Sequence, residues 1–322
     1  MINFFYHPGY AKRKKVIFTL NLRRSVLLNK LINLTYLFNI PFPSNYITNG
    51  THKCMNNSLK ALIKNTKSSY NKDLYPNSYI LQFDWYGEKM LNQILNNKIQ
   101  NKKILIGPLY TNEQLKNLVN YVNKYDFIKI VAASKNAAQN ISNNNLQINK
   151  DSLCVIPTGI ISEKKLLKMN TLARNDRCLI YYKNREEEEL QKVTEFLKNK
   201  NYAYDLFEYG KYSNSQLIRA AKNNKFCILL NSSESQGIAV QEIMSANIPL
   251  YVWNISSKYD SSVPYFDERC GIATYNYDEF VNKFELFINT LNSYSPKQLI
   301  LDKLTFEKFI QNLEYEFDEI NC

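Results

Sequence analysis

The sequence predicts an α/β protein made of two Rossmann-like, doubly wound domains that face a cleft. Short β-prone apolar runs alternate with stretches of helical periodicity from about residue 35, and the alternation restarts near residue 177. The length of 322 residues suits two domains of ordinary size. Repeated β-α units build parallel sheets covered by helices, and such sheets bind ligands beyond the carboxyl ends of their strands. We therefore expect one domain over residues 1–165 and a second over residues 166–322 that includes the C-terminal helices.

The first half contains five short apolar runs that we expect to form buried strands. Among the helices expected between them, the clearest places Leu115, Leu118 and Val122 at helical spacing. The segment NGTHK, residues 49–53, reads as a turn that precedes the first of these helices. The expected strands cover residues 34–40, 78–84, 102–110, 127–134 and 152–160, and the expected helices cover 54–65, 85–97, 113–125 and 135–141.

The second half repeats the rhythm with five further apolar runs. Helical stretches separate the first four of these runs, and three more helical stretches follow the last run. No internal repeat is evident in the chain. The expected strands cover residues 177–185, 202–210, 225–230, 249–254 and 271–276, and the expected helices cover 186–200, 213–224, a stretch from residue 237, and the three closing stretches.

Positive charge is concentrated in the first half. Residues 1–160 hold 21 Lys/Arg and 6 Asp/Glu, a net charge of +15, whereas residues 161–322 hold 20 and 23, a net charge of −3. A basic half beside a nearly neutral half indicates that one half meets an anionic partner, such as a membrane surface, a phosphate-bearing acceptor or nucleic acid. A run such as KRKK, residues 12–15, also fits a solvated surface.

The sequence also indicates the compartment. It has no run of about 18 apolar residues, so we expect no transmembrane helix. The N-terminal residues lack the apolar core of a secretory signal, and the six cysteines form no CxxC pair. These features favour a cytoplasmic protein without a zinc site or a disulfide framework.

One junction carries polar groups suited to a ligand. The segment NSSESQGIAVQEIMSANIP, residues 231–249, follows an apolar strand, and Gly237 opens a helix at its centre. The start of that helix offers free backbone N–H groups and a positive dipole end, which suit a phosphate. Glu234 precedes the glycine and Glu242 lies on the helix, and carboxylates accept hydrogen bonds from sugar hydroxyls. The alternative is a serine-rich cap with a chance surface glutamate.

These motifs resemble those of retaining glycosyltransferases with the GT-B fold, of the glycosyltransferase family 4 type. The segment ESQGIAVQE matches the Glu-x7-Glu signature of that family, and EIMSANIP follows the pattern with Asn247 in place of a glycine. The segments VAASKNAAQNI and VIPTGI resemble two further family segments, with Thr158 in place of an asparagine. LIYYKNR resembles the first strand of the donor domain, where a basic pair binds the nucleotide pyrophosphate. The resemblance covers residues 127–254 best.

The resemblance implies a role for each residue of the second half. Glu242 would bind the ribose hydroxyls of a UDP- or GDP-linked sugar, and Glu234 would bind hydroxyls of the sugar itself. Lys183 and Arg185 would neutralise the departing diphosphate, since fixed cations stabilise charge that develops in a transition state. Backbone N–H groups near the helix start would contact the donor; they belong to Ser235, Gln236, Gly237 and Ile238. No metal and no cofactor would be required, and the sequence shows no Asp-x-Asp motif.

The basic half would bind a glycan or a lipid-linked acceptor, with possible peripheral contact to a membrane. Family members often use a histidine near the first turn, and His52 is placed for this role, although a loop histidine can also be incidental. Asp84 follows an expected strand and would serve as a base or an acceptor contact. Its alternative role is to cap the helix that follows.

Three other functions use the same features less well. A sugar-nucleotide epimerase of this fold would need a histidine-rich cleft, and the chain has two histidines. A nucleic-acid-binding protein would need a reader motif, and none is recognisable. A non-catalytic relative that binds glycans or serves as a structural partner would be expected to lose the two glutamates or the basic pair, and both are present. Transfer of a sugar with retention of configuration is the preferred hypothesis.

Overall fold

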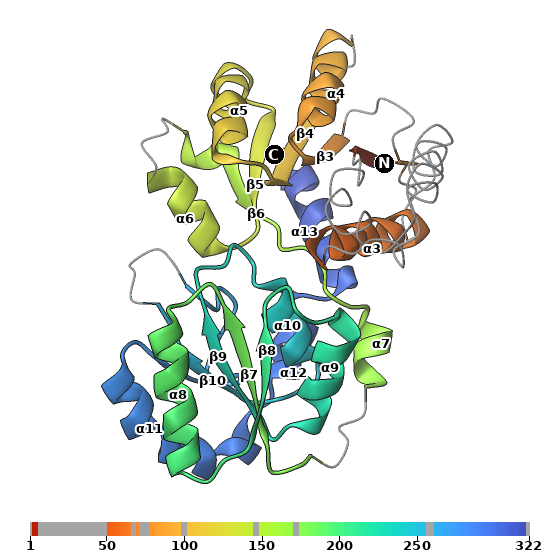
Figure 1. Cartoon of the computed structure of the whole chain (residues 1–322). Helices are drawn as coiled ribbons and strands as arrows, with labels where there is room; N and C mark the ends of the chain where they lie inside the picture. The colour runs from red at the N-terminus through yellow and green to blue at the C-terminus, as the bar shows by residue number, and fades with distance from the viewer. Residues whose placement is uncertain are drawn as a thin grey trace, which may run out of the picture. The chain divides into compact units, whose positions relative to one another are not determined.

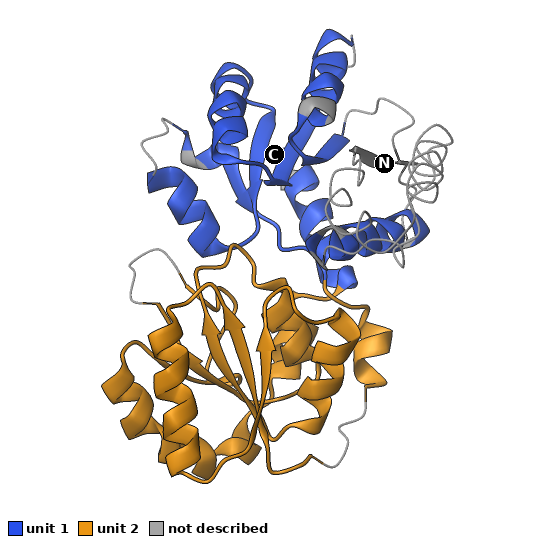
Figure 2. Ribbon diagram, viewed as in Figure 1, with its two compact units in different colours: residues 1–159, 306–322 blue, residues 160–305 orange. Residues whose placement is uncertain are grey.

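The computed structural model describes residues 2–5, 50–65, 69–70, 77–97, 102–143, 148–169, 174–255 and 261–319. The chain divides into two compact units (Figure 2). Unit 1 comprises residues 1–159 and 306–322, and unit 2 comprises residues 160–305. The boundary at residue 159 lies close to the expected one, but the last helix differs from expectation. It belongs to unit 1 and not to the second domain, because its apolar face is buried in the core of unit 1.

Unit 1 contains a parallel sheet of six strands in the order β2-β1-β3-β4-β5-β6. Helices connect the later strands, as the β-α rhythm predicts (Figure 1). The strands are β1 (Ile2–Phe5), β2 (Ser69–Tyr70), β3 (Asn77–Gln82), β4 (Lys103–Leu109), β5 (Ile128–Ala132) and β6 (Leu153–Val155). The helices are α3 (Gly50–Asn65), α4 (Trp85–Asn96), α5 (Asn112–Lys124), α6 (Lys135–Asn143) and α13 (Phe306–Glu319), with a 3-10 turn at Lys150–Ser152.

Helix α13 packs against one face of this sheet together with α3. Its residues Phe309, Leu313 and Phe317 are buried in a core cluster that also contains Leu59 and Leu105. Two lysines at the start of neighbouring strands bind the end of the helix. Lys103 donates to the carbonyl of Phe317, and Lys129 Nζ lies 3.0 Å from Glu316 Oε2. A cation near the carbonyl end of a helix is stabilising, so these contacts fix the end of α13 to the sheet of unit 1.

Unit 2 contains a parallel sheet of five strands in the order β11-β10-β9-β7-β8. In chain order this is the 2-1-3-4-5 arrangement of doubly wound sheets, whose order reverses between the first and third strands. The strands are β7 (Cys178–Lys183), β8 (Tyr204–Glu208), β9 (Phe226–Asn231), β10 (Leu250–Trp253) and β11 (Gly271–Thr274). The helices are α7 (Glu163–Leu167), α8 (Glu187–Asn199), α9 (Asn214–Asn223), α10 (Ile238–Ser245), α11 (Tyr277–Asn289) and α12 (Pro296–Lys303), with a 3-10 turn at Leu291–Ser293.

Aromatic rings fill one core of unit 2. Tyr251 contacts Phe280, Phe284 and Phe287 with ring centroids between 4.7 and 5.5 Å apart. Rings on β10 and α11 therefore hold this helix against the sheet. Within the described residues, no helix is both long and apolar enough to cross a membrane.

The start of unit 1 differs from the sequence-based expectation in two places. A strand forms at Ile2–Phe5, and it pairs with β3 in parallel. Residues 50–53 belong to helix α3 and do not form the turn expected from NGTHK, because Leu59 and Leu62 anchor that helix in the core. The strand expected at residues 34–40 lies outside the described residues.

Candidate functional site

The candidate residues of unit 2 gather where its strand order reverses. Lys183 ends β7, and Glu234 lies in the loop after β9, the strand that pairs with β7. Parallel strands end at the same edge, and a doubly wound sheet leaves a crevice between the two strands where its order reverses. The fold thus brings together two residues separated by 51 positions in the sequence.

Lys183 and Glu234 form an ion pair. The lysine Nζ lies 2.6 Å from Glu234 Oε1, and the two side chains are 17% and 13% exposed. The same ammonium group lies over the ring of Tyr209, 4.7 Å from its centroid. A cation over an aromatic face is attracted by the electron density of the ring. The lysine is therefore held at the strand end by a carboxylate and a ring.

Hydrogen bonds to a second segment fix the loop that carries Glu234. The backbone N–H of Glu234 donates to the carbonyl of Ser261 over 3.0 Å. Asn231, the last residue of β9, donates to the carbonyl of Ser262 and accepts from its hydroxyl, at 2.8 and 2.6 Å. No local pattern in the sequence distinguishes Ser261 and Ser262 from other serines.

Helix α10 begins at Ile238, one residue after the start that the sequence predicts. Gly237 precedes it with φ 78° and ψ 47°, the left-handed conformation that favours glycine. Gln236 is buried and exchanges hydrogen bonds with Gln241 at 3.0 and 2.7 Å, which ties the loop to the first turns of the helix. Ser235 is exposed, and Ile238 is the first residue of the helix.

The second glutamate lies on α10 and is approached by the segment between β8 and α9. The amide of Asn214, the first residue of α9, donates a hydrogen bond to Glu242 Oε2. Burial raises the pKa of Tyr212, and the negative charges of Glu242 and Glu234 raise it further. The ring of Tyr212 meets that of Tyr181 at an angle of 66°.

Contacts within the protein occupy most of the Arg185 guanidinium. Its guanidinium is bound by the Glu189 carboxylate and donates to the carbonyls of Trp253 and Asn231 over 2.8 and 3.4 Å. The side chain is 8% exposed and lies 5.5 Å from the Trp253 ring centroid. Four of its five N–H donors are occupied by these contacts, two on one terminal nitrogen, one on the other and one on Nε. Its main structural role is to join three strand ends.

Asn247 follows α10 at the position where the resembling family has a glycine. Its φ is 58°, so it adopts the left-handed conformation that commonly ends a helix. Asparagine tolerates this conformation better than other residues with a side chain. The substitution noted in the sequence therefore preserves the backbone path.

The two candidate residues of unit 1 lie after β3 and in helix α3. Asp84 lies between β3 and α4, where its Oδ1 accepts from the N–H of Gly87 over 3.0 Å and caps the helix. His52 lies in the first turn of α3 and not in a turn before the helix. The segment VIPTGI, residues 155–160, contacts α3. Ser58 Oγ of this helix donates to the carbonyl of Gly159 over 3.1 Å.

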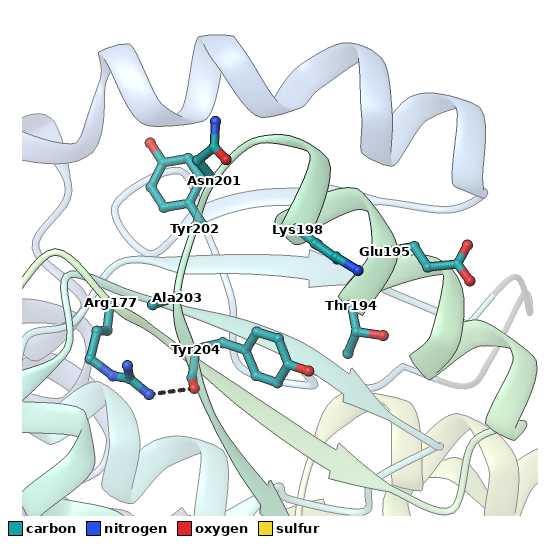
Figure 3. Close-up of a pocket in the computed structure, with 8 residues that line it drawn as sticks. All are labelled: Arg177, Thr194, Glu195, Lys198, Asn201, Tyr202, Ala203 and Tyr204. Carbon is teal, nitrogen blue, oxygen red and sulfur yellow. Dashed lines mark hydrogen bonds between the residues drawn. The ribbon is translucent and has the colours of Figure 1, made fainter.

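A shallow groove of about 520 Å³ lies at the opposite edge of the sheet of unit 2 (Figure 3). It lies beside Arg177 and Tyr204, at the amino ends of β7 and β8. Arg177 is bound there by the Asp205 carboxylate, and it donates to the carbonyl of Tyr204, as the dashed line in Figure 3 shows. Its charge is thus neutralised. Among the described residues, no group of three or more His, Cys, Asp or Glu side chains could hold a metal ion.

Comparison of the whole structure with solved structures finds glycosyltransferases. A mutant of S. aureus TarM, in complex with fondaparinux, α-GlcNAc-glycerol and UDP, matches with TM-score 0.51 and 12% identity over 83% of this chain and 58% of that chain. AviGT4, a glycosyltransferase involved in avilamycin A biosynthesis, matches with TM-score 0.54 and 7% identity over 84% and 90%. The lipopolysaccharide outer core galactosyltransferase WaaB, in apo form, matches with TM-score 0.51 and 12% identity over 99% of each chain.

The likeness defines the fold. The chain has two parallel α/β sheets with the GT-B architecture of these glycosyltransferases, as the sequence predicts. It spans little more than half of the TarM chain. Comparison of the sequence with protein-family models finds no match, and comparison with curated proteins finds none either.

Proposed function

We propose that this protein is a retaining glycosyltransferase that moves a sugar from a nucleotide-sugar donor to a glycan or lipid-linked acceptor. One observation carries the proposal. Lys183, Glu234 and the start of α10 meet at the reversal point of the sheet in unit 2, and Glu242 lies on the same helix. A cation, two carboxylates and a helix start are the groups that a sugar nucleotide requires.

Each group has a proposed role. The ammonium of Lys183 and the N–H groups of residues 235–238 stabilise the departing diphosphate of a UDP- or GDP-linked sugar, without a metal. Glu234 binds hydroxyls of the transferred sugar, and Glu242 binds the ribose. Arg185 contributes positive charge from behind the strand ends, and its contacts make it chiefly a support for the loop. Retention of configuration follows from the resemblance to the glycosyltransferase family 4 type.

We assign acceptor binding to unit 1. Its part of the site would include Asp84, which follows β3, and His52 in the first turn of α3. The net charge of +15 on residues 1–160 suits an anionic acceptor or the surface of an anionic membrane. With this assignment the protein acts in the cytoplasm, with peripheral membrane contact.

Thermal stabilisation by nucleotides tests the proposal. A ligand that binds only the folded state raises the melting temperature, so UDP, GDP and their sugar conjugates are compared on the wild type and on Glu242→Ala. We expect one nucleotide to stabilise the wild type and to lose most of that effect with the variant. If no nucleotide stabilises the wild type at millimolar concentration, the donor site is refuted.

A second function, that of a non-catalytic glycan-binding protein, is favoured by the Arg185 contacts alone, since they leave Lys183 as the principal cation. Transfer and binding are distinguished by release of nucleoside diphosphate from the stabilising donor. A non-catalytic protein would bind the donor without releasing the diphosphate at a rate above that of Glu234→Ala.

A further inference from the structure

We infer that Asn214 is a positioning residue that orients Glu242 for the ribose of the donor. The inference rests on the proposed function and concerns a residue that the Glu-x7-Glu signature does not include. Asn214 is 28 residues before Glu242 in the sequence, and its amide Nδ2 donates to Glu242 Oε2. Both side chains are half-buried, so water screens this contact only in part.

The backbone around Asn214 is fixed before any ligand binds. Ser213 caps α9 with a reciprocal capping box, in which Gln216 N donates to Ser213 Oγ over 3.3 Å and Ser213 N donates to Gln216 Oε1 over 2.8 Å. Leu217 and Ala221 bury the inner face of this helix, which packs against α10. The asparagine therefore projects from a rigid helix start toward a rigid helix, which is the arrangement that holds a functional group in one orientation.

The chemistry of the pair suits this role. A carboxylate accepts hydrogen bonds only, and the asparagine amide donates through nitrogen. The hydrogen bond from Asn214 to Oε2 restricts the orientation of the Glu242 carboxylate. The carboxylate is then oriented in advance to accept hydrogen bonds from the two neighbouring hydroxyls of a ribose. A free glutamate on a helix surface would have to lose its rotamer freedom at the moment of binding. The predicted result of losing Asn214 is weaker binding of any nucleotide that carries a ribose diol.

The loop before Asn214 strengthens the assignment to the donor site. Tyr209 lies under the Lys183 ammonium, and Asn214 donates a hydrogen bond to Glu242. One segment of six residues, from Tyr209 to Asn214, thus contacts groups at both ends of the proposed donor site. Ser213 already caps α9, so the contact of Asn214 with Glu242 is not needed to start that helix.

A double-mutant cycle tests the inference. Dissociation constants of UDP and GDP are measured for the wild type, Asn214→Ala, Glu242→Ala and the double variant. We expect Asn214→Ala to weaken the preferred nucleotide about tenfold, the value of one hydrogen bond to a charged group. Because the asparagine acts through Glu242, it should have no further effect in the Glu242→Ala background. Additive effects, or an unchanged constant in Asn214→Ala, would overturn the inference.

Two further variants separate positioning from folding. Asn223→Ala removes the same amide at the last residue of the same helix, and it should leave nucleotide binding unchanged. Asn214→Asp has the shape of asparagine but places a carboxylate beside Glu242, and two such carboxylates bind a proton more readily. A shared proton restores a donor, so the affinity of Asn214→Asp relative to wild type should rise as the pH falls from about 8 to about 5. A ratio that is independent of pH contradicts the role.

The outcomes for the inference and for the proposed function are distinct. If the wild type binds a nucleotide and Glu242→Ala weakens it, the donor site stands, and only the two Asn214 variants decide the inference. If the wild type binds neither UDP nor GDP, both fail together. The 2′-deoxy form of the preferred nucleotide gives the last control, since it should bind wild type and Asn214→Ala with nearly equal affinity.

Discussion

Lys183 Nζ lies 2.6 Å from Glu234 Oε1, so the cation assigned to the diphosphate and the carboxylate assigned to the sugar neutralise one another. A donor that binds here must separate this pair, at least in part, because the phosphate and the carboxylate compete for one ammonium group. The pair keeps the site free of an unbalanced buried charge. The same contact also predicts opposite effects of one substitution on binding and on turnover.

Glu234→Gln should bind nucleoside diphosphate more tightly than the wild type. The substitution removes the competing charge from Lys183 and keeps the shape, so the dissociation constant should fall about fivefold, the value of a partly exposed ion pair. Turnover with the matching nucleotide sugar should fall at least about 100-fold, because the carboxylate no longer contacts the reacting sugar. Titration calorimetry and diphosphate release measure the two quantities. Glu268→Gln, an exposed carboxylate of the same unit, is the control, and weaker diphosphate binding by Glu234→Gln would refute the competition.

Arg185→Ala should lower stability more than a surface substitution does. The arginine is 8% exposed and bonds Glu189 and the carbonyls of Asn231 and Trp253, which lose a partner when it is removed. Breaking one side of a buried ion pair costs about 3 kcal/mol of unfolding free energy. Urea unfolding followed by fluorescence measures this change. Full stability in Arg185→Ala with a loss of nucleotide binding would instead make the arginine a direct phosphate ligand.

Much of the local structure around the candidate site of unit 2 could be predicted from the sequence, because its signals lie within short segments. An apolar run marks β9, a glycine marks the left-handed turn at Gly237, and helical spacing marks the buried face of α10. Asn247 departs from the pattern of the resembling family, and its φ of 58° is a conformation that asparagine tolerates.

The remaining features depend on contacts between distant segments. Arg185 follows the end of a strand, where residues of a binding site are expected. In the structure its guanidinium instead bonds the Trp253 carbonyl and the Glu189 carboxylate. Asn214 carries no signature, and only the packing of α9 beside α10 brings it to Glu242. The periodicity of the closing helix α13 predicts an apolar face but not which unit that face packs against, so it could not show that the helix returns to unit 1.

Shortening a buried side chain of α13 should destabilise unit 1. Leu313 is fully buried there in a cluster with Leu59 and Tyr79, and Leu313→Ala should cost about 3 kcal/mol through lost burial and the cavity left behind. Hydrogen exchange resolved by peptides should show faster exchange in β3 and β4 and unchanged exchange in β9 and β10. Equal loosening of both units would contradict the assignment of this helix to unit 1. Tyr315→Ala, at an exposed position of the same helix, is the matched control.

A cluster around Arg269 should make unit 2 sensitive to acid. Hydrogen bonds from Arg269 lower the pKa of Asp267 and of Asp302 below the ordinary value of 3.8. A carboxylate whose pKa is lower in the folded state contributes stability that is complete above its ordinary pKa and is lost as the pH falls through the folded value. The urea midpoint of the wild type should therefore fall between about pH 4 and about pH 2, and it should fall less in Asp267→Asn. An equal slope in both proteins would show that the cluster does not contribute.

Gly237→Ala and Asn201→Ala form a matched pair for the donor site. Both residues have positive φ, 78° and 58°, so an alanine at either position should cost about 1 kcal/mol of stability. A Cβ at Gly237 meets no atom closer than 3.7 Å, so strain and not collision causes the cost there. Asn201 lies between α8 and β8, at the amino end of that strand. Relief of the strain at Gly237 would turn the N–H groups at the start of α10 away from the diphosphate. Gly237→Ala should therefore weaken diphosphate binding about tenfold, whereas Asn201→Ala should leave it within about twofold of the wild type. Melting temperatures and dissociation constants measured together separate the two effects. Equal losses of binding in both variants would show that the start of α10 has no special place in the site.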